Sequence, residues 1–151
     1  MILLVHLIFG ATIGTIIRNV PLAIFIALFS HYLLDTIPHL DYSIKDIEDN
    51  RRRKVLSGSF KVVLDLFMGI YLVLLFSSNQ TIVYVCAFFA LFPDGLTVLK
   101  YIFPGNKILE SHYAFHQKVH FLKDKKISTF WRIFNQIAVV IISVIILLFL
   151  H

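Results

Sequence analysis

Apolar residues occur along this chain in long runs that short polar stretches separate. Five runs are apolar enough to predict helices that cross a membrane, at 1–17, about 21–36, about 55–77, about 80–103 and 129–150. Residues 107–122 mix apolar and polar side chains at helical spacing, which predicts an amphipathic helix at the membrane surface. We therefore expect an all-α, polytopic helical membrane protein with about five transmembrane helices, one interfacial amphipathic helix, and a single integral-membrane domain over residues 1–151.

Local residues predict where several of these helices begin and end. Asn19 can cap the second helix, with Pro21 in its first turn. Pro38 ends that helix, since the residue before a proline avoids helical geometry. Pro93, within Pro93-Asp94-Gly95, predicts a break or kink in the fourth run. The first run is as short as the core of a signal peptide, but its basic residue, Arg18, follows it, so we expect a retained helix.

Composition agrees with a membrane protein. Hydrophobic residues make up 58% of the chain and charged residues 15%, against about 25% charged in soluble domains. Mean hydropathy is +0.83. The single Cys86 lies in an apolar run, so it predicts packing and excludes an intrachain disulfide.

The net charge of +5 comes mainly from two basic clusters, RRRK at 51–54 and KDKK at 123–126. In an apolar protein these clusters mark the cytoplasmic side of a bacterial-type inner membrane, and a nucleic-acid surface is not favoured. The uncharged SSNQ turn at 77–80 then lies outside. With this topology, the acids inside the helices and the histidines of 107–122 all lie near the cytoplasmic face.

Histidine and aspartate residues recur at spacings that suit a metal site. His31 and Asp35 share one face of a helix, because they are four residues apart. Ionisable groups at membrane depth default to a functional role, and imidazole with carboxylate is a ligand set for divalent metals. The candidate metal ligands are His31, Asp35, His39, Asp41, Asp65, Asp94, His112, His116 and His120.

Some of these residues have simpler interpretations. Asp65 could pair with Lys61 along its own helix, and Asp94 could cap a helix restart. The three histidines of 107–122 could form the polar face of an interfacial helix, and they lack the glutamate of an HExxH protease motif. His6 lies in an apolar helix with no partner nearby, and we interpret it as structural.

Nine candidate ligands exceed what one tetrahedral zinc takes, so we predict two or more divalent ions, zinc first, with manganese or iron as alternatives. Glu110 is a candidate general base, a candidate hydrogen-bond partner of a metal ligand, or a candidate ligand itself. Lys61, or an arginine among 51–53, is a candidate for neutralising phosphate charge.

The motif from His31 to Asp41, Phe92-Pro93-Asp94 and the following histidine-rich helix resemble the LexA-binding, inner-membrane-associated metal-dependent hydrolase family. His31, Asp35, Pro38 and His39 are also similar to the H-x-x-x-D-x-x-Q-P-x-H motif of zinc-dependent phospholipases C and single-strand nucleases. Here Ile37 replaces the glutamine, and His39 follows the proline directly. Both resemblances imply hydrolysis of a phosphoester or a related ester.

The predicted function is therefore membrane-embedded, metal-dependent hydrolysis, with water activated by metal attacking a phosphoester of a lipid or another membrane-associated substrate. The alternative is a transition-metal transporter or a metal-sensing membrane protein that uses the same ligands. A transporter needs polar groups that continue to the far leaflet, and the outer halves of the long helices contain almost none. A third interpretation, a scaffold that binds a partner through its basic loops, leaves the candidate ligands unexplained.

Overall fold

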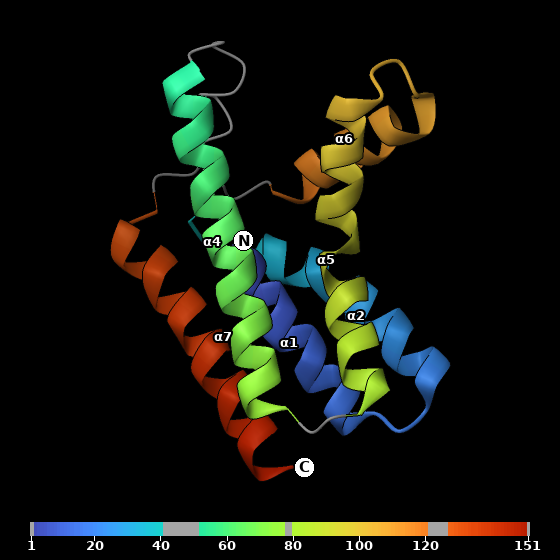
Figure 1. Cartoon of the computed structure of the whole chain (residues 1–151), viewed down its shortest axis with the longest axis vertical. Coiled ribbons are helices and arrows are strands. Elements are labelled where there is room, and N and C mark those ends of the chain that lie inside the picture. The colour runs from blue at the N-terminus through green and yellow to red at the C-terminus, as the bar shows by residue number, and fades with distance from the viewer. Residues whose placement is uncertain (1, 41–51, 78–79, 121–126, 151) are drawn as a thin grey trace.

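The structure is a computed structural model that describes residues 2–40, 52–77, 80–120 and 127–150. The described residues form no β-strand and six helices (Figure 1): α1 Leu3–Ile16, α2 Val20–Thr36, α4 Arg52–Phe76, α5 Thr81–Ile102, α6 Lys107–Val119 and α7 Thr129–Phe149. The predicted all-helical class is confirmed, and each helix boundary lies within three residues of its predicted position.

The prediction of about five spanning helices is wrong, because only three of the described helices have the length and composition to cross a membrane. These are α5, α7 and the part of α4 from Ser59 to Phe76. With 14 and 17 residues, α1 and α2 reach only about 21 and 26 Å at 1.5 Å per residue, short of a hydrocarbon core of about 30 Å. The described part of the chain thus has three long apolar helices and a shorter apolar pair.

The first helix, α1, is the centre of the bundle. It packs against α2, α4, α5 and α7, and in Figure 1 it lies behind α4, between α7 and the α2–α5 side. Its side chains are buried on every face, including Val5, Ile8 and Ala11. A helix that is apolar all round needs such a surround, so α1 is fixed by its neighbours on all sides.

Two glycines let α1 and α5 approach closely. A Cβ atom at Gly10 would lie 2.5 Å from the Cβ of Ala90 and 2.7 Å from the carbonyl oxygen of Cys86. One turn further on, a Cβ atom at Gly14 would lie 2.8 Å from the Cα of Val83. Small residues four apart are a common contact between membrane helices. The buried, free Cys86 belongs to this contact, in agreement with its predicted packing role.

The helix ends confirm two of the predicted signals and correct a third. The side chain of Asn19 accepts a hydrogen bond from the Leu22 N–H at 3.0 Å, and α2 ends at Thr36, two residues before Pro38. However, α5 continues through Pro93, so the predicted break there is wrong. Proline disturbs the turn before it, and the ring of His31 bonds the Ala90 carbonyl in that turn at 2.7 Å.

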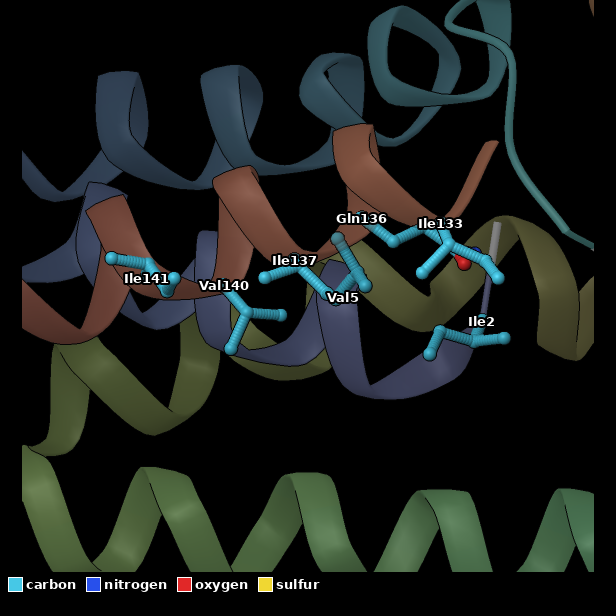
Figure 2. A pocket seen from close by; sticks show the side chains of 7 residues that line it. All are labelled: Ile2, Val5, Ile133, Gln136, Ile137, Val140 and Ile141. Carbon is cyan, nitrogen blue, oxygen red and sulfur yellow. The ribbon is translucent and has the colours of Figure 1, made fainter. Parts of the chain in front are cut away.

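An apolar groove with a volume of about 200 Å³ runs between α1 and α7 (Figure 2). Its lining residues are Ile2, Val5, Ile133, Gln136, Ile137, Val140 and Ile141. None of these side chains is ionisable. The groove therefore offers hydrophobic contact, and the chemistry of the protein lies elsewhere.

We expect Gly10→Ala to destabilise the protein by about 1–3 kcal/mol, because the added methyl group overpacks the contact with α5. Gly95→Ala is the matched control within α5. A Cβ atom there meets nothing within 4 Å, so the change should be neutral or stabilise the helix by up to about 1 kcal/mol. Thermal unfolding in detergent measures both, and a Gly10→Ala protein as stable as the wild type would contradict the packing.

Candidate metal centre

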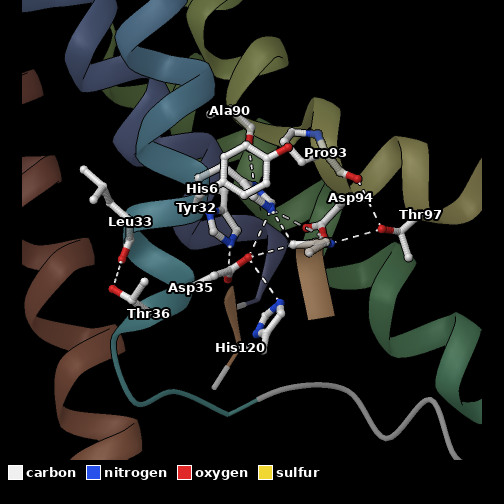
Figure 3. A network of polar contacts seen from close by, with 12 residues as sticks. His6, Tyr32, Leu33, Asp35, Thr36, Ala90, Pro93, Asp94, Thr97 and His120 are labelled. Atoms are coloured by element: carbon white, nitrogen blue, oxygen red, sulfur yellow. Dashed lines mark hydrogen bonds and ion pairs between the residues drawn. The ribbon is translucent and has the colours of Figure 1, made fainter. Parts of the chain in front are cut away.

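The Asp35 carboxylate lies at the centre of a histidine cluster at one end of the bundle (Figure 3). Only 1% of its side chain is exposed. The Nε2 atoms of five histidines lie within 4.0 Å of its oxygens: His6 at 3.3 Å and His39 at 4.0 Å from Oδ1, and His116 at 2.9 Å, His31 at 3.1 Å and His120 at 3.3 Å from Oδ2. One buried acid is thus shared by five imidazoles.

Three of these atoms form a nearly equilateral triangle. The Nε2 atoms of His31 and His116 are 3.1 Å apart, and they lie 3.1 and 2.9 Å from Oδ2 of Asp35. Ligand atoms at 2.0–2.1 Å from a tetrahedral zinc are separated by about 3.3 Å. The Oδ1 atom of Asp94 lies 3.7 Å from His31 and 3.9 Å from His116. Asp94 thus lies beside the triangle of His31, Asp35 and His116, at a slightly longer distance from the two rings than the edges of a zinc site.

Hydrogen bonds behind the two rings fix which nitrogen faces the centre. Nδ1 of His31 lies 2.7 Å from the carbonyl oxygen of Ala90, which can only accept, so this Nδ1 carries the proton. Nδ1 of His116 lies 3.1 Å from the hydroxyl oxygen of Thr97, whose own proton is donated to the Pro93 carbonyl. Metal-bound histidines are oriented in this way by a partner at the other nitrogen.

This arrangement of protons leaves lone pairs facing one another. If each ring is neutral and protonated at Nδ1, both Nε2 atoms are acceptors, and they point at each other and at a carboxylate oxygen. Acceptors at 2.9–3.1 Å repel unless positive charge lies between them. A cation shared by the three atoms removes the repulsion, and the residues present fit a divalent metal.

A second set of ligand atoms adjoins the first. Asp35, His39 and His120 each offer one atom, and these atoms lie within 4.8 Å of one another. Nδ1 of His39 donates to the Ile37 carbonyl at 2.6 Å, so its Nε2 faces the carboxylate. Because Asp35 belongs to both sets, it can bridge two neighbouring ions.

Local sequence explains how the chain brings these groups together. His31 and Asp35 are one helical turn apart on α2, and His116 and His120 are one turn apart at the end of α6. The chain turns between α5 and α6 at Gly105, whose φ of 88° suits glycine. α6 then packs on both α5 and α2. The two pairs therefore meet across the end of α2.

The structure brings together six of the predicted ligands: His31, Asp35, His39, Asp94, His116 and His120. Asp41 lies outside the described residues. Asp65 is directed elsewhere, since its Oδ2 accepts a hydrogen bond from the Leu4 N–H at 3.0 Å and so caps the start of α1.

His112, Glu110 and Lys61 are also outside the clusters of possible metal ligands that the described residues form. Nε2 of His112 lies 3.1 Å from the Tyr32 hydroxyl oxygen. Burial, together with the neighbouring His116 and His31, lowers the pKa of His112, so its neutral ring can accept this hydroxyl proton at neutral pH. Glu110, in the first turn of α6, and Lys61, on α4, are both exposed.

His6 belongs to the cluster as well, and its interpretation as a structural residue without a nearby partner is wrong. The His6 ring is fully buried and stacks on His31 with 4.1 Å between ring centroids. It also forms a possible ligand group with His31 and Asp94. The available signal was its position: α1 begins at the end of the bundle where α2 finishes, so a histidine in its first turns lies level with the end of α2.

Thr97 was missed as well. It lies three residues after Asp94 on α5, and its hydroxyl group orients His116. Its signal is weak, because threonine is common in apolar helices and bonds its own backbone there.

Comparisons with protein-family models, with curated proteins and with solved structures give no match for this chain. The family resemblance of the histidine and aspartate motifs therefore stays a prediction.

Proposed function

We propose that this protein is a membrane-embedded, metal-dependent hydrolase that cleaves a phosphoester of a membrane-associated substrate, with lipids as the leading class. The observation that carries the proposal is the convergence of His31 Nε2, His116 Nε2 and Asp35 Oδ2 on one point, with the two rings held from behind. Such an arrangement is costly in a buried site unless a cation is held there.

The proposed ligands form two adjacent sites. One ion would be held by His31, Asp35 and His116, with Asp94 beside the two histidines, and the other by Asp35, His39 and His120. Imidazole and carboxylate ligands suit zinc, and also manganese or iron. Bound divalent ions at such a pair of sites supply an acidic water molecule and offset charge on a phosphoryl oxygen.

Charge balance supports an anionic substrate. The two carboxylates, Asp35 and Asp94, carry two negative charges, and two divalent ions carry four positive ones. The loaded centre would then have a net positive charge with neutral histidines, which favours binding of a phosphate group. Asp94 lies on the accessible side, because 27% of its side chain is exposed while Asp35 is buried. A phosphoryl group would reach the centre from that side.

The location of the centre supports action at one membrane face. It lies where α1 begins and α2 ends. In the sequence, the basic cluster RRRK stands at the start of α4, which follows α2, and KDKK stands between α6 and α7. By the positive-inside rule, this end faces the cytoplasm.

The distribution of buried charge favours hydrolysis over transport. Among the described residues, every buried histidine or acid belongs to the cluster around Asp35: His6, His31, Asp35, His39 and His116. A transport path needs polar groups that continue across the membrane. The far half of the described bundle is packed instead by apolar side chains such as Val83, Leu147 and Val73.

Asp35→Asn should abolish metal binding, because both sites share this carboxylate, and His116→Ala should remove the ion of the first site. Elemental analysis of the purified protein measures the metal per chain. His112→Ala is the matched control on α6, since His112 bonds Tyr32 and should leave the metal content unchanged. Equal metal content in the His116→Ala protein and the wild type would contradict the centre.

We expect the wild type, loaded with zinc or manganese, to release the headgroup or phosphate from phospholipid vesicles. A chelator should abolish this turnover, and added metal should restore it. Asp94→Asn should lower turnover by about 10–100-fold, as changes to metal ligands and their surroundings commonly do. A protein that binds metal but cleaves neither phosphomonoesters nor phosphodiesters would overturn the hydrolase proposal and favour a metal sensor.

A further inference from the structure

Two neighbouring amides of α7 hold the backbone on either side of His39. The Asn135 side chain donates to the Pro38 carbonyl at 3.0 Å, and the Gln136 side chain donates to the Leu40 carbonyl at 2.9 Å. Gln136 is 7% exposed, within a helix that is otherwise mainly apolar. Figure 2 shows Gln136 between Ile133 and Ile137 along α7. A buried amide in such a helix normally has a specific partner.

The segment that these amides hold has no helical hydrogen bonds of its own. α2 ends at Thr36, and residues 38–40 are irregular. The His39 ring donates to the Ile37 carbonyl at 2.6 Å, so the ring follows the course of this backbone. Hydrogen bonds are stronger in a low-dielectric interior than in water. The two bonds from α7 therefore determine where His39 lies.

The two proposed metal sites differ in how they are built. Apart from the shared Asp35, the ligands of the first site are His31 and His116, which lie within α2 and α6, and Asp94 of α5 lies beside them. The second site depends on His39, in an irregular segment, and on His120, which follows the last residue of α6. Ligands on regular helices are held more accurately than ligands on loops, so the second site needs support from outside.

We infer that Asn135 and Gln136 are positioning residues for His39, and that through it they set the affinity for a second divalent ion. This inference rests on the proposed metal-dependent function. The two ions then bind with different affinities, and the weaker one depends on α7. Each amide acts on His39 through the backbone, because its N–H donates to the carbonyl of a residue next to His39.

The test is a titration of the full-length protein in detergent with Co²⁺, whose visible absorption counts the bound ions and reports their ligands. Gln136→Met and Asn135→Leu keep the approximate side-chain shape and remove the donor. We expect the first equivalent to bind as in the wild type and the second to bind about 10–100-fold more weakly. Ser143→Ala is the matched control, because Ser143 is also a buried polar residue of α7 and lies far along the helix from residues 135–136.

A double-mutant cycle separates positioning from general stability. His39→Ala alone should weaken the second equivalent, and adding Gln136→Met to it should cause no further loss, because both changes act through one ring. The absorption spectrum of the first equivalent should stay constant throughout. A structural defect would instead lower both equivalents and add to the effect of His39→Ala.

Three results would overturn the inference: a wild type that binds fewer than two ions, amide variants that bind the second ion normally, or amide variants that lose both equivalents equally. Should Gln136→Met fail to fold, Asn135→Leu tests the same contact from the other carbonyl. The two proposals can be told apart. Absence of turnover in a protein with both ions bound would contradict the proposed hydrolysis, and it would leave the positioning role of Asn135 and Gln136 intact.

Discussion

The structure depends on one constraint, which is the almost wholly buried carboxylate of Asp35. The histidine nitrogens that face this carboxylate also carry lone pairs. Asp35 is almost completely shielded from water, and His31 and His116 give it no proton if both rings are protonated at Nδ1. Burying an uncompensated charge costs several kcal/mol, of the order of the whole stability of a domain. The bundle is therefore compatible with this centre only when positive charge is present there. If the positive charge is a bound metal ion, its binding would be coupled to folding.

The fold and the centre share their contacts. Ala90 packs against Gly10 of α1 through its Cβ atom, and its carbonyl oxygen anchors His31 of α2. Pro93, one turn from these contacts, cannot donate to the carbonyl of Phe89, and its own carbonyl accepts a hydrogen bond from Thr97, which also bonds His116. The residues that join α1, α2 and α5 thus also orient the histidines of the candidate metal centre.

The sequence predicted the depth of the polar groups better than their direction. Counting residues at a fixed rise placed the end of α2, Asp94 and the histidines of α6 at one end of the bundle, and these groups do meet. The same counting gave Asp65 a suitable depth, but its rotation about α4 directs it to the Leu4 N–H. Rotation depends on which face of a helix packs inward, and α4 is apolar on nearly every face. His112 shows the same effect, since each step of four residues turns a helix by about 40°.

The number of spanning helices was overestimated for a related reason. Hydropathy distinguishes an apolar helix from a polar one, but a buried helix and a membrane-crossing helix look alike when both are short. α1 is apolar because protein surrounds it. His6 was missed with it, because its partners, His31 and Asp35, come from another helix and no spacing within α1 points to them.

The short helices explain why a polar centre can exist inside so apolar a protein. α4, α5 and α7 are long enough to match the hydrocarbon core, whereas α2 ends after 17 residues. The last turn of α2, which carries Asp35, therefore ends between longer helices. α6 packs across α2 and α5 and contributes the polar groups that a membrane-spanning helix could not carry. A longer α2 would continue its apolar surface into the space that His39, His116 and His120 share around Asp35. The early end of α2 at Ile37-Pro38 is thus as necessary to the centre as the ligands themselves.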